Sequence, residues 1–314
     1  MEYWKKRALE LEASGLGPAE ITRRLENELD YKISYNTVKS FLRRQRNDGS
    51  NSAEKRVVIQ NNEPTHISTK WDGTKTLKFA IVSDTHIGSR YTQFTHLNKF
   101  YDLCAMSGVT DVYHAGDVTE GLKMRVGHEY ELADISADDM RDSVIKNYPK
   151  RPGITTHFIT GNHDASIYKQ VGYDIGAAIA RVRKDMKYLG KDCAVINLTP
   201  NCTLELRHPW DGMAYAISYK PQKMIEAMES DSKPNILAIG HYHKAEYIFY
   251  RNVHALQAGC FQGQTPFTRG KGISVHLGGW IITVRVDDKG TIQSFAPEFV
   301  PFYSSIKDDY KKFK

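Results

Sequence analysis

The chain has 314 residues, of which 40% are hydrophobic and 25% are charged, and its formal net charge at pH 7 is +6. These are ordinary values for a globular protein, and the length leaves room for one large domain and one small one. No stretch approaches the roughly 20 apolar residues of a membrane span, and no apolar run follows the first basic residues, so we expect neither a membrane segment nor a signal peptide.

Residues 1–46 carry the apolar spacing of three helices. The first helix is predicted over residues 4–13 and ends at a Ser-Gly-Leu-Gly stretch. The second begins at Pro18, because proline suits the first turn of a helix. After a loop, Ser34 is placed to cap a third helix over residues 35–46.

One face of the predicted third helix is polar and basic. It presents Asn36, Lys39, Arg43 and Arg46, whose side chains can reach phosphates or base edges. The order of the three helices and this basic face resemble the helix-turn-helix modules of resolvases and transposases, and the resemblance implies DNA as a partner. The alternatives are a small helical bundle with a solvated basic face, or a module that docks on another protein.

The composition of the chain changes after this module. Residues 47–76 are predicted to be a linker, because they start with a polar run that lacks apolar anchors. From there on, short apolar runs alternate with helical stretches, which is typical of a layered α/β domain. We therefore expect a small all-α domain at residues 1–46 and an α/β domain at residues 77–314.

Five strand-like runs in this second domain end in side chains that can bind metals or move protons. These side chains are Asp84, His86, Asp117, Asn162, His163, Asp164, His208, His241 and His243. Sites in α/β sheets collect at the carboxyl ends of the strands, and residues two apart in an extended chain project to the same side. We therefore expect these side chains to lie together.

The expected cluster suits a pair of transition-metal ions, because it combines carboxylates, imidazoles and an amide. Asp117 could bridge two cations about 3.5–4 Å apart, which would clamp a phosphate and lower the pKa of a water nucleophile. His163 is then placed to protonate the leaving alcohol, with Asp164 fixing its tautomer and charge. His128 lies on the loop after Asp117 and could reach substrate.

The same residues carry a family resemblance. Asp84-Thr85-His86, Gly116-Asp117, Gly161-Asn162-His163-Asp164, His208 and Gly240-His241-Tyr242-His243 together resemble the signature of the calcineurin-like metallophosphoesterases. The resemblance implies a four-layer α-β-β-α sandwich and two divalent ions, Mn²⁺ first, with Fe or Zn²⁺ as alternatives. It implies that one ion is bound by Asp84, His86, Asp117 and His243. It implies that the other is bound by Asp117, Asn162, His208 and His241.

The loop after Asp117 bears on the substrate. Protein Ser/Thr phosphatases resemble one another in an Asp-Arg-Gly sequence there, whereas this chain has Val118-Thr119-Glu120-Gly121 and lacks that arginine. Its Asn-His-Asp sequence looks more like the nuclease and phosphodiesterase branch, which includes the Mre11/SbcD exonucleases.

A tethered DNA-binding arm would raise the effective concentration of the catalytic site near DNA. We therefore predict a DNA-directed phosphodiesterase, either a nuclease or a DNA-end-processing enzyme. A phosphomonoesterase or small-nucleotide phosphodiesterase is the first alternative. A DNA-binding regulatory protein that carries a phosphatase domain is the second. The four cysteines form no Cys-x-x-Cys pair, so we expect a reducing, cytoplasmic location rather than a disulfide framework.

Overall fold

The computed structural model describes residues 3–29, 33–50, 64–230 and 232–314, without the side chains of residues 43–50. The chain divides into two compact units, Met1–Asn61 and Asn62–Lys314. Each unit has a hydrophobic core of its own.

The N-terminal unit contains three helices, which lie where the apolar spacing predicts them. They are α1 (Tyr3–Ala13), α2 (Pro18–Glu28) and α3 (Tyr35–Ser50). Their shared core consists of Trp4, Ala8, Leu11, Ile21, Leu25, Ile33, Val38 and Leu42. The Ser34 hydroxyl accepts a hydrogen bond from the Thr37 amide at 3.2 Å, so Ser34 caps α3 as expected.

Helix α3 carries the residues predicted to contact DNA. Asn36 and Lys39 are exposed, and the Lys39 ammonium lies 5.4 Å from the centre of the Tyr35 ring. The backbones of Arg43 and Arg46 belong to α3, which continues four residues beyond the predicted end at residue 46. The side chains of these two arginines lie outside the described part of the chain.

The larger unit is built on two six-stranded sheets. The first has the strand order β12-β11-β2-β3-β4-β5. Its strands are β2 (Thr76–Val82), β3 (Asp111–Ala115), β4 (Thr155–Thr160), β5 (Met186–Lys191), β11 (Gly278–Val286) and β12 (Ile292–Pro301). Strands β2 to β5 are parallel, with Ile81 opposite Tyr113 and Tyr113 opposite His157. The carboxyl ends of β2, β3 and β4 therefore meet at one edge of the sheet.

The second sheet has the strand order β1-β6-β7-β8-β10-β9. Its strands are β1 (Thr65–Ser68), β6 (Cys193–Thr199), β7 (Cys202–Arg207), β8 (Ile236–Ile239), β9 (Ala245–Tyr250) and β10 (Val253–Ala258). Strands β7, β8 and β10 are parallel. Because β7 and β8 are neighbours, the segments that follow Arg207 and Ile239 also lie side by side.

Strand β1 corrects the predicted linker. Residues 65–68 fall within the expected linker 47–76, yet they pair in parallel with β6, with Thr65 opposite Ala194. The strand is four residues long, lies at the edge of its sheet and is mostly exposed. It therefore lacks the alternation of apolar and polar residues by which strands are recognised.

Apolar side chains from both sheets fill the space between them. Phe79 and Ile81 of β2 and Ile282 of β11 belong to the same core cluster as Leu204 of β7 and Leu256 of β10. This shared core makes the unit a β-sandwich. Each sheet also has a second apolar face, which helices cover.

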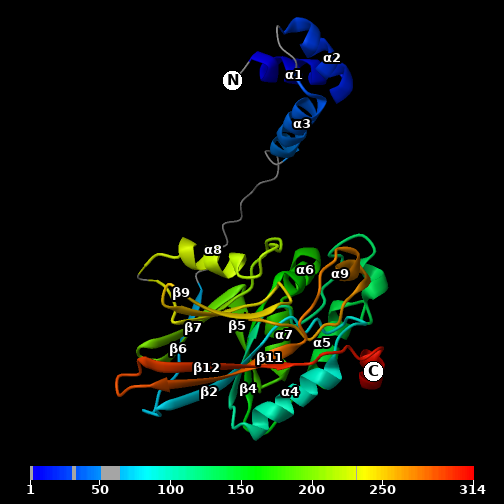
Figure 1. Ribbon diagram of the computed structural model, residues 1–314. Helices are drawn as coiled ribbons and strands as arrows, with labels where there is room; N and C mark the ends of the chain where they lie inside the picture. The colour runs from blue at the N-terminus through cyan, green and yellow to red at the C-terminus, as the bar shows by residue number, and fades with distance from the viewer. Residues whose placement is uncertain (1–2, 30–32, 51–63, 231) are drawn as a thin grey trace. The chain divides into compact units, whose positions relative to one another are not determined.

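Helices on both outer faces complete the four-layer α-β-β-α architecture that was predicted. The first sheet is covered by α4 (Phe94–Met106), α5 (Ala137–Asn147), α6 (Asn162–Val171) and α7 (Ile175–Val182), and the second by α8 (Tyr219–Ala227) (Figure 1). Shorter helices are η1 (His128–Glu131), α9 (Pro266–Gly270) and η2 (Asp309–Phe313). None of the described helices combines the length and apolar content of a transmembrane span.

Candidate metal centre

The backbone is strained where the strands end. Ten described non-glycine residues have a positive φ, and five of them are candidate ligands: Asp84, His86, Asp117, His241 and His243, with φ between 46° and 77°. Each such residue costs of the order of 1–3 kcal/mol and persists only where the surroundings impose it. The concentration of this strain at the predicted ligands marks the edge of the sandwich as a functional site.

Hydrogen bonds between the loops impose this conformation. The Asp84 amide donates to the Gly116 carbonyl at 3.0 Å, which ties the end of β2 to the end of β3. The Asp117 carboxylate accepts from the His163 amide at 2.9 Å, and the Asp84 carboxylate accepts from the His241 amide at 2.9 Å. Loops from both sheets are thus fastened through the two aspartates.

The first group of candidate ligands consists of Asp84, His86 and His243, whose ligand atoms lie close enough together to hold one ion. The Nε2 atoms of His86 and His243 are 3.1 Å apart, and Asp84 Oδ1 lies 3.6 Å from the first and 3.3 Å from the second. Asp117 Oδ2 lies 3.8 Å from His86 Nε2. Four side chains therefore converge on one point.

The second group consists of Asp117, His208 and His241, with Asn162 beside them. His208 Nε2 lies 3.1 Å from Asp117 Oδ2 and 3.1 Å from Asn162 Oδ1. His241 Nδ1 lies 2.9 Å from the same amide oxygen. The structure thus brings together all the residues predicted as ligands, and Asp117 Oδ2 lies near histidines of both groups, His86 and His208.

The hydrogen bonds of the imidazoles fit metal binding. His208 Nδ1 donates to the Ala115 carbonyl at 2.7 Å, and His241 Nε2 donates to the Asp211 carbonyl at 2.8 Å. In both rings the other nitrogen is left as a lone-pair donor toward Asp117 and Asn162. Metal-binding histidines are characteristically oriented by such a bond to their second nitrogen.

The charge of the site also fits metal binding. Asp84 and Asp117 are almost completely buried, and their described ion pairs are all with histidines. Burial opposes ionisation of Asp117, yet the nearby imidazoles, His208 above all, hold the pKa of its carboxyl below the ordinary value. Two buried carboxylates beside imidazoles that can each offer a ring nitrogen are a donor set for divalent cations.

Two glycines allow the loops to approach this closely. A Cβ atom on Gly161 would lie 2.3 Å from Asp117 Oδ1, and one on Gly116 would lie 2.4 Å from His208 Nδ1. Gly116 also has a φ of 94°, which favours glycine. A side chain at either position would displace a candidate ligand.

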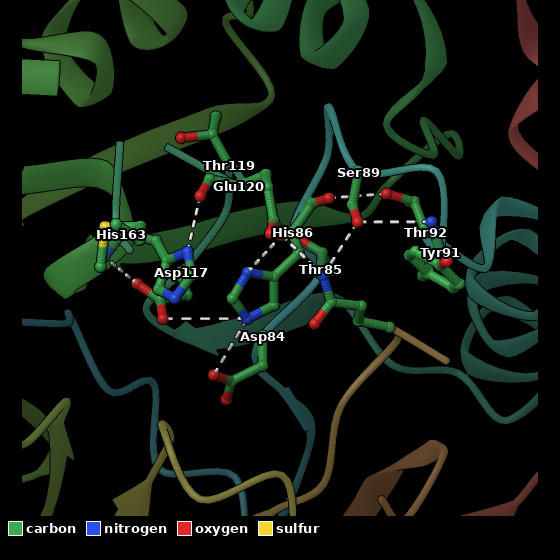
Figure 2. A network of polar contacts seen from close by, with 12 residues as sticks. Asp84, Thr85, His86, Ser89, Tyr91, Thr92, Asp117, Thr119, Glu120 and His163 are labelled. Carbon is green, nitrogen blue, oxygen red and sulfur yellow. Dashed lines mark hydrogen bonds and ion pairs between the residues drawn. The ribbon is translucent and has the colours of Figure 1, made fainter. Parts of the chain in front are cut away.

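Glu120 is a candidate functional residue that the sequence did not reveal. Its carboxylate is buried, and Oε2 lies 3.0 Å from His86 Nδ1, the nitrogen that faces away from the candidate ion (Figure 2). His128 Nε2 lies 2.8 Å from Oε1, and Gln262 Nε2 donates to Oε2 at 2.6 Å. Glu120 therefore lies where its negative charge can orient the His86 ring. The available signal was a carboxylate three residues after Asp117 on the same loop.

The structure corrects the expectation for His128. This side chain is fully buried, with Nε2 bound to Glu120 and Nδ1 accepting from the Met124 amide at 3.3 Å. Both ring nitrogens are thus used inside the protein, and His128 does not line the cavity described below. Its described contact with a carboxylate is the one with Glu120.

The structure also corrects the prediction that Asp164 sets the tautomer of the His163 ring. Asp164 accepts hydrogen bonds from the amides of Val118, Thr119 and Gly161 and from the Thr119 hydroxyl, at 2.6–3.0 Å. His163 Nδ1 instead donates to the main-chain carbonyl of Glu120 at 2.5 Å (Figure 2). Asp164 thus joins the loops after β3 and β4, and a backbone carbonyl sets the His163 tautomer.

A cavity of about 290 Å³ opens onto this cluster. Its lining includes His86, Asp117, His163, His241 and His243. His163 also lies within ligand-atom reach of His86 and Asp117, and its ring centre is 4.5 Å from that of His86. A molecule in the cavity would therefore meet the candidate ligands and His163 together.

The calcineurin-like phosphoesterase superfamily domain matches residues 77–276, and the chain belongs to this superfamily. It is a phosphoester hydrolase of a class whose members use divalent metal ions. The DNA polymerase II small subunits of two *Halobacterium salinarum* strains are 23% identical to it over 261 residues. The match covers 72% of this chain and 51% of each subunit, so the chain spans about half the length of these curated relatives.

Solved structures with a similar fold include a novel archaeal phosphodiesterase, at 12% identity and a TM-score of 0.41. That match covers 71% of this chain and all of the other. Wild-type Vps29 of *Entamoeba histolytica*, complexed with zinc, is 16% identical with a TM-score of 0.33, over 72% of this chain and 99% of its own.

Glu120→Gln tests the orienting role of Glu120. The amide keeps the size of the side chain but loses the charge that faces His86, so metal affinity is expected to fall by about 10–100-fold. Titration of the metal-free protein with Mn²⁺, followed by calorimetry, measures this loss. Glu298→Gln makes the same chemical change on the exposed face of β12 and should leave the affinity unchanged. Equal affinities in the two variants would exclude the orienting role.

Proposed function

We propose that this chain is a DNA-directed phosphodiesterase, a nuclease or DNA-end-processing enzyme that works with two divalent ions. The observation that carries the proposal is the position of Asp117, which belongs to the second ligand group and whose Oδ2 also lies 3.8 Å from His86 of the first. Asp117 and His163 both line the cavity. A carboxylate placed between two ligand groups can bridge two ions, and an imidazole beside it can supply a proton to the leaving group.

The candidate ligands divide between the two ions. One ion would be held by Asp84, His86, Asp117 and His243, and the other by Asp117, Asn162, His208 and His241. When bound, such ions polarise the phosphate and supply an activated water nucleophile. Mn²⁺ is our first choice, with Fe or Zn²⁺ as alternatives, because imidazole, carboxylate and amide donors occur together.

His163 is proposed to protonate the leaving alcohol. Its Nδ1 proton is committed to the Glu120 carbonyl, so Nε2 is the nitrogen left to carry a proton to substrate. Burial lowers the pKa of His163, and the negative charge of Asp117 opposes that shift. A phosphate anion in the cavity would also oppose the lowering of this pKa, which favours the protonated imidazole when substrate is bound.

His163→Ala tests this role through the leaving group. Turnover of an alkyl phosphodiester is expected to fall by about 10²–10⁴-fold, the usual range for a general acid. The loss should shrink for a nitrophenyl diester, because nitrophenolate leaves without protonation. His66→Ala, on exposed β1, serves as the control. A loss of the same size for both leaving groups would show that His163 positions the phosphate instead.

Two observations support DNA as the substrate. The similar curated proteins are named as subunits of a DNA polymerase, and the N-terminal helices present the exposed Asn36 and Lys39 on α3. We propose that this unit binds DNA through the face that also includes Arg43 and Arg46.

We also propose that the catalytic domain begins before residue 77, because β1 belongs to its second sheet.

Removing the three cations of α3 in the full-length chain tests the DNA-binding role. Lys39→Ala/Arg43→Ala/Arg46→Ala should weaken binding to duplex DNA and reduce the log–log salt slope by about 0.9 for each lost phosphate contact. A control that removes the exposed Lys99, Lys187 and Lys289 makes the same change in net charge. Salt titrations measure the DNA affinity and its salt slope for both variants. An equal slope in both variants would make the N-terminal unit a docking or structural element.

A further inference from the structure

A second cavity, of about 320 Å³, adjoins the one at the candidate metal centre. Met213, Tyr242 and Ile273 line both cavities. Tyr242 stands in sequence between the candidate ligands His241 and His243. A chain-like substrate whose phosphate lies at the metal centre can therefore extend directly into this second space.

The second cavity is cationic. Lys220, Lys244 and Lys271 line it, and none of its described lining residues is acidic; we call it the lysine pocket. The Lys244 ammonium is held by the Ser274 carbonyl and hydroxyl, both at 2.6 Å, and Lys220 pairs with Asp211 at the border with the first cavity. The candidate metal centre next to it is rich in carboxylates, so the lysine pocket suits an anion that extends beyond the reacting phosphate.

The lysine pocket also offers a flat apolar surface. Tyr215 is fully exposed, and Ile217 and Met213 on the same loop are exposed as well. This loop is anchored at both ends: the Gln257 amide donates to the Ile217 carbonyl at 2.8 Å, and the Tyr242 hydroxyl donates to Asp211 at 2.5 Å. Exposed aromatic rings beside lysines are the elements by which proteins hold unpaired bases and their phosphates.

We propose that the lysine pocket binds the unpaired nucleotide that flanks the scissile phosphate. The inference rests on the proposed phosphodiesterase function and specifies its substrate as single-stranded DNA, or as a duplex end that has opened. The size of the pocket favours one nucleotide, because about 320 Å³ lies at the lower end of the roughly 300–1,000 Å³ typical of small-ligand sites. A pocket of this size has no room for a base together with its complement, so the bound base is unpaired.

Tyr215→Ala/Lys271→Ala in the full-length chain removes the stacking surface and one cation without disturbing buried groups. Tyr303→Ala/Lys99→Ala removes an equally exposed pair elsewhere and is the matched control. We measure kcat/KM with Mn²⁺ for a single-stranded oligonucleotide, for its blunt duplex and for bis(p-nitrophenyl) phosphate. Loss of one stacked base and one contact should lower kcat/KM on the single strand at least about tenfold more than on the nitrophenyl diester.

Wild-type enzyme should also prefer the single strand to the blunt duplex. If the pocket variant loses no more activity on the single strand than on the nitrophenyl diester, the lysine pocket is not a nucleotide site. The proposal is equally overturned if the control variant shows the same selective loss. If wild-type enzyme cleaves the nitrophenyl diester and no DNA, the DNA-directed function itself fails, a result distinct from an insensitive pocket variant.

Discussion

The burial of two carboxylates, those of Asp84 and Asp117, is the constraint around which the catalytic unit is arranged. Burying a carboxylate without hydrogen-bond or charge partners costs several kcal/mol of folding free energy. Here each carboxylate accepts a hydrogen bond from a backbone amide and lies beside imidazoles. Their desolvation favours a bound cation. Backbone strain at the same positions adds to the energy that the surrounding fold must offset.

The sandwich can offset this energy because its apolar cores are extensive. Apolar residues of both sheets share one core, and helices cover the outer faces. The first sheet contributes Asp84, Asp117 and Asn162, while His208 and His241 follow strands of the second. The candidate metal centre therefore depends on the packing of one sheet against the other, and neither sheet alone contains both ligand groups.

Much of this arrangement could be predicted from the sequence. Asp84 and His86 follow an apolar run, and Gly116, Gly161 and Gly240 mark sharp turns beside polar residues, so local pattern was sufficient. Glu120 was missed, and the contacts of His128 and Asp164 were misjudged, because they depend on partners 3 to 142 residues away in the chain. Local pattern does not show whether a loop histidine points into a cavity or toward a buried carboxylate.

The edge strand β1 and the lysine pocket were missed for a related reason. Strand β1 gains its structure only by pairing with β6, far along the chain, and its own residues are mostly polar. The lysine pocket joins a loop after β7, the end of β8 and the segment after α9. Its lysines are ordinary surface residues in sequence, and only the tertiary structure places them beside the candidate metal centre.

Crystals equilibrated with Mn²⁺ and measured at the manganese absorption edge test the central claim most directly. The account predicts two anomalous peaks, one against Asp84, His86 and His243 and the other against Asn162, His208 and His241. The Asp117 carboxylate should lie between them and contact both. A single peak, or two peaks of which only one touches Asp117, would contradict the assignment of a carboxylate-bridged pair of ions.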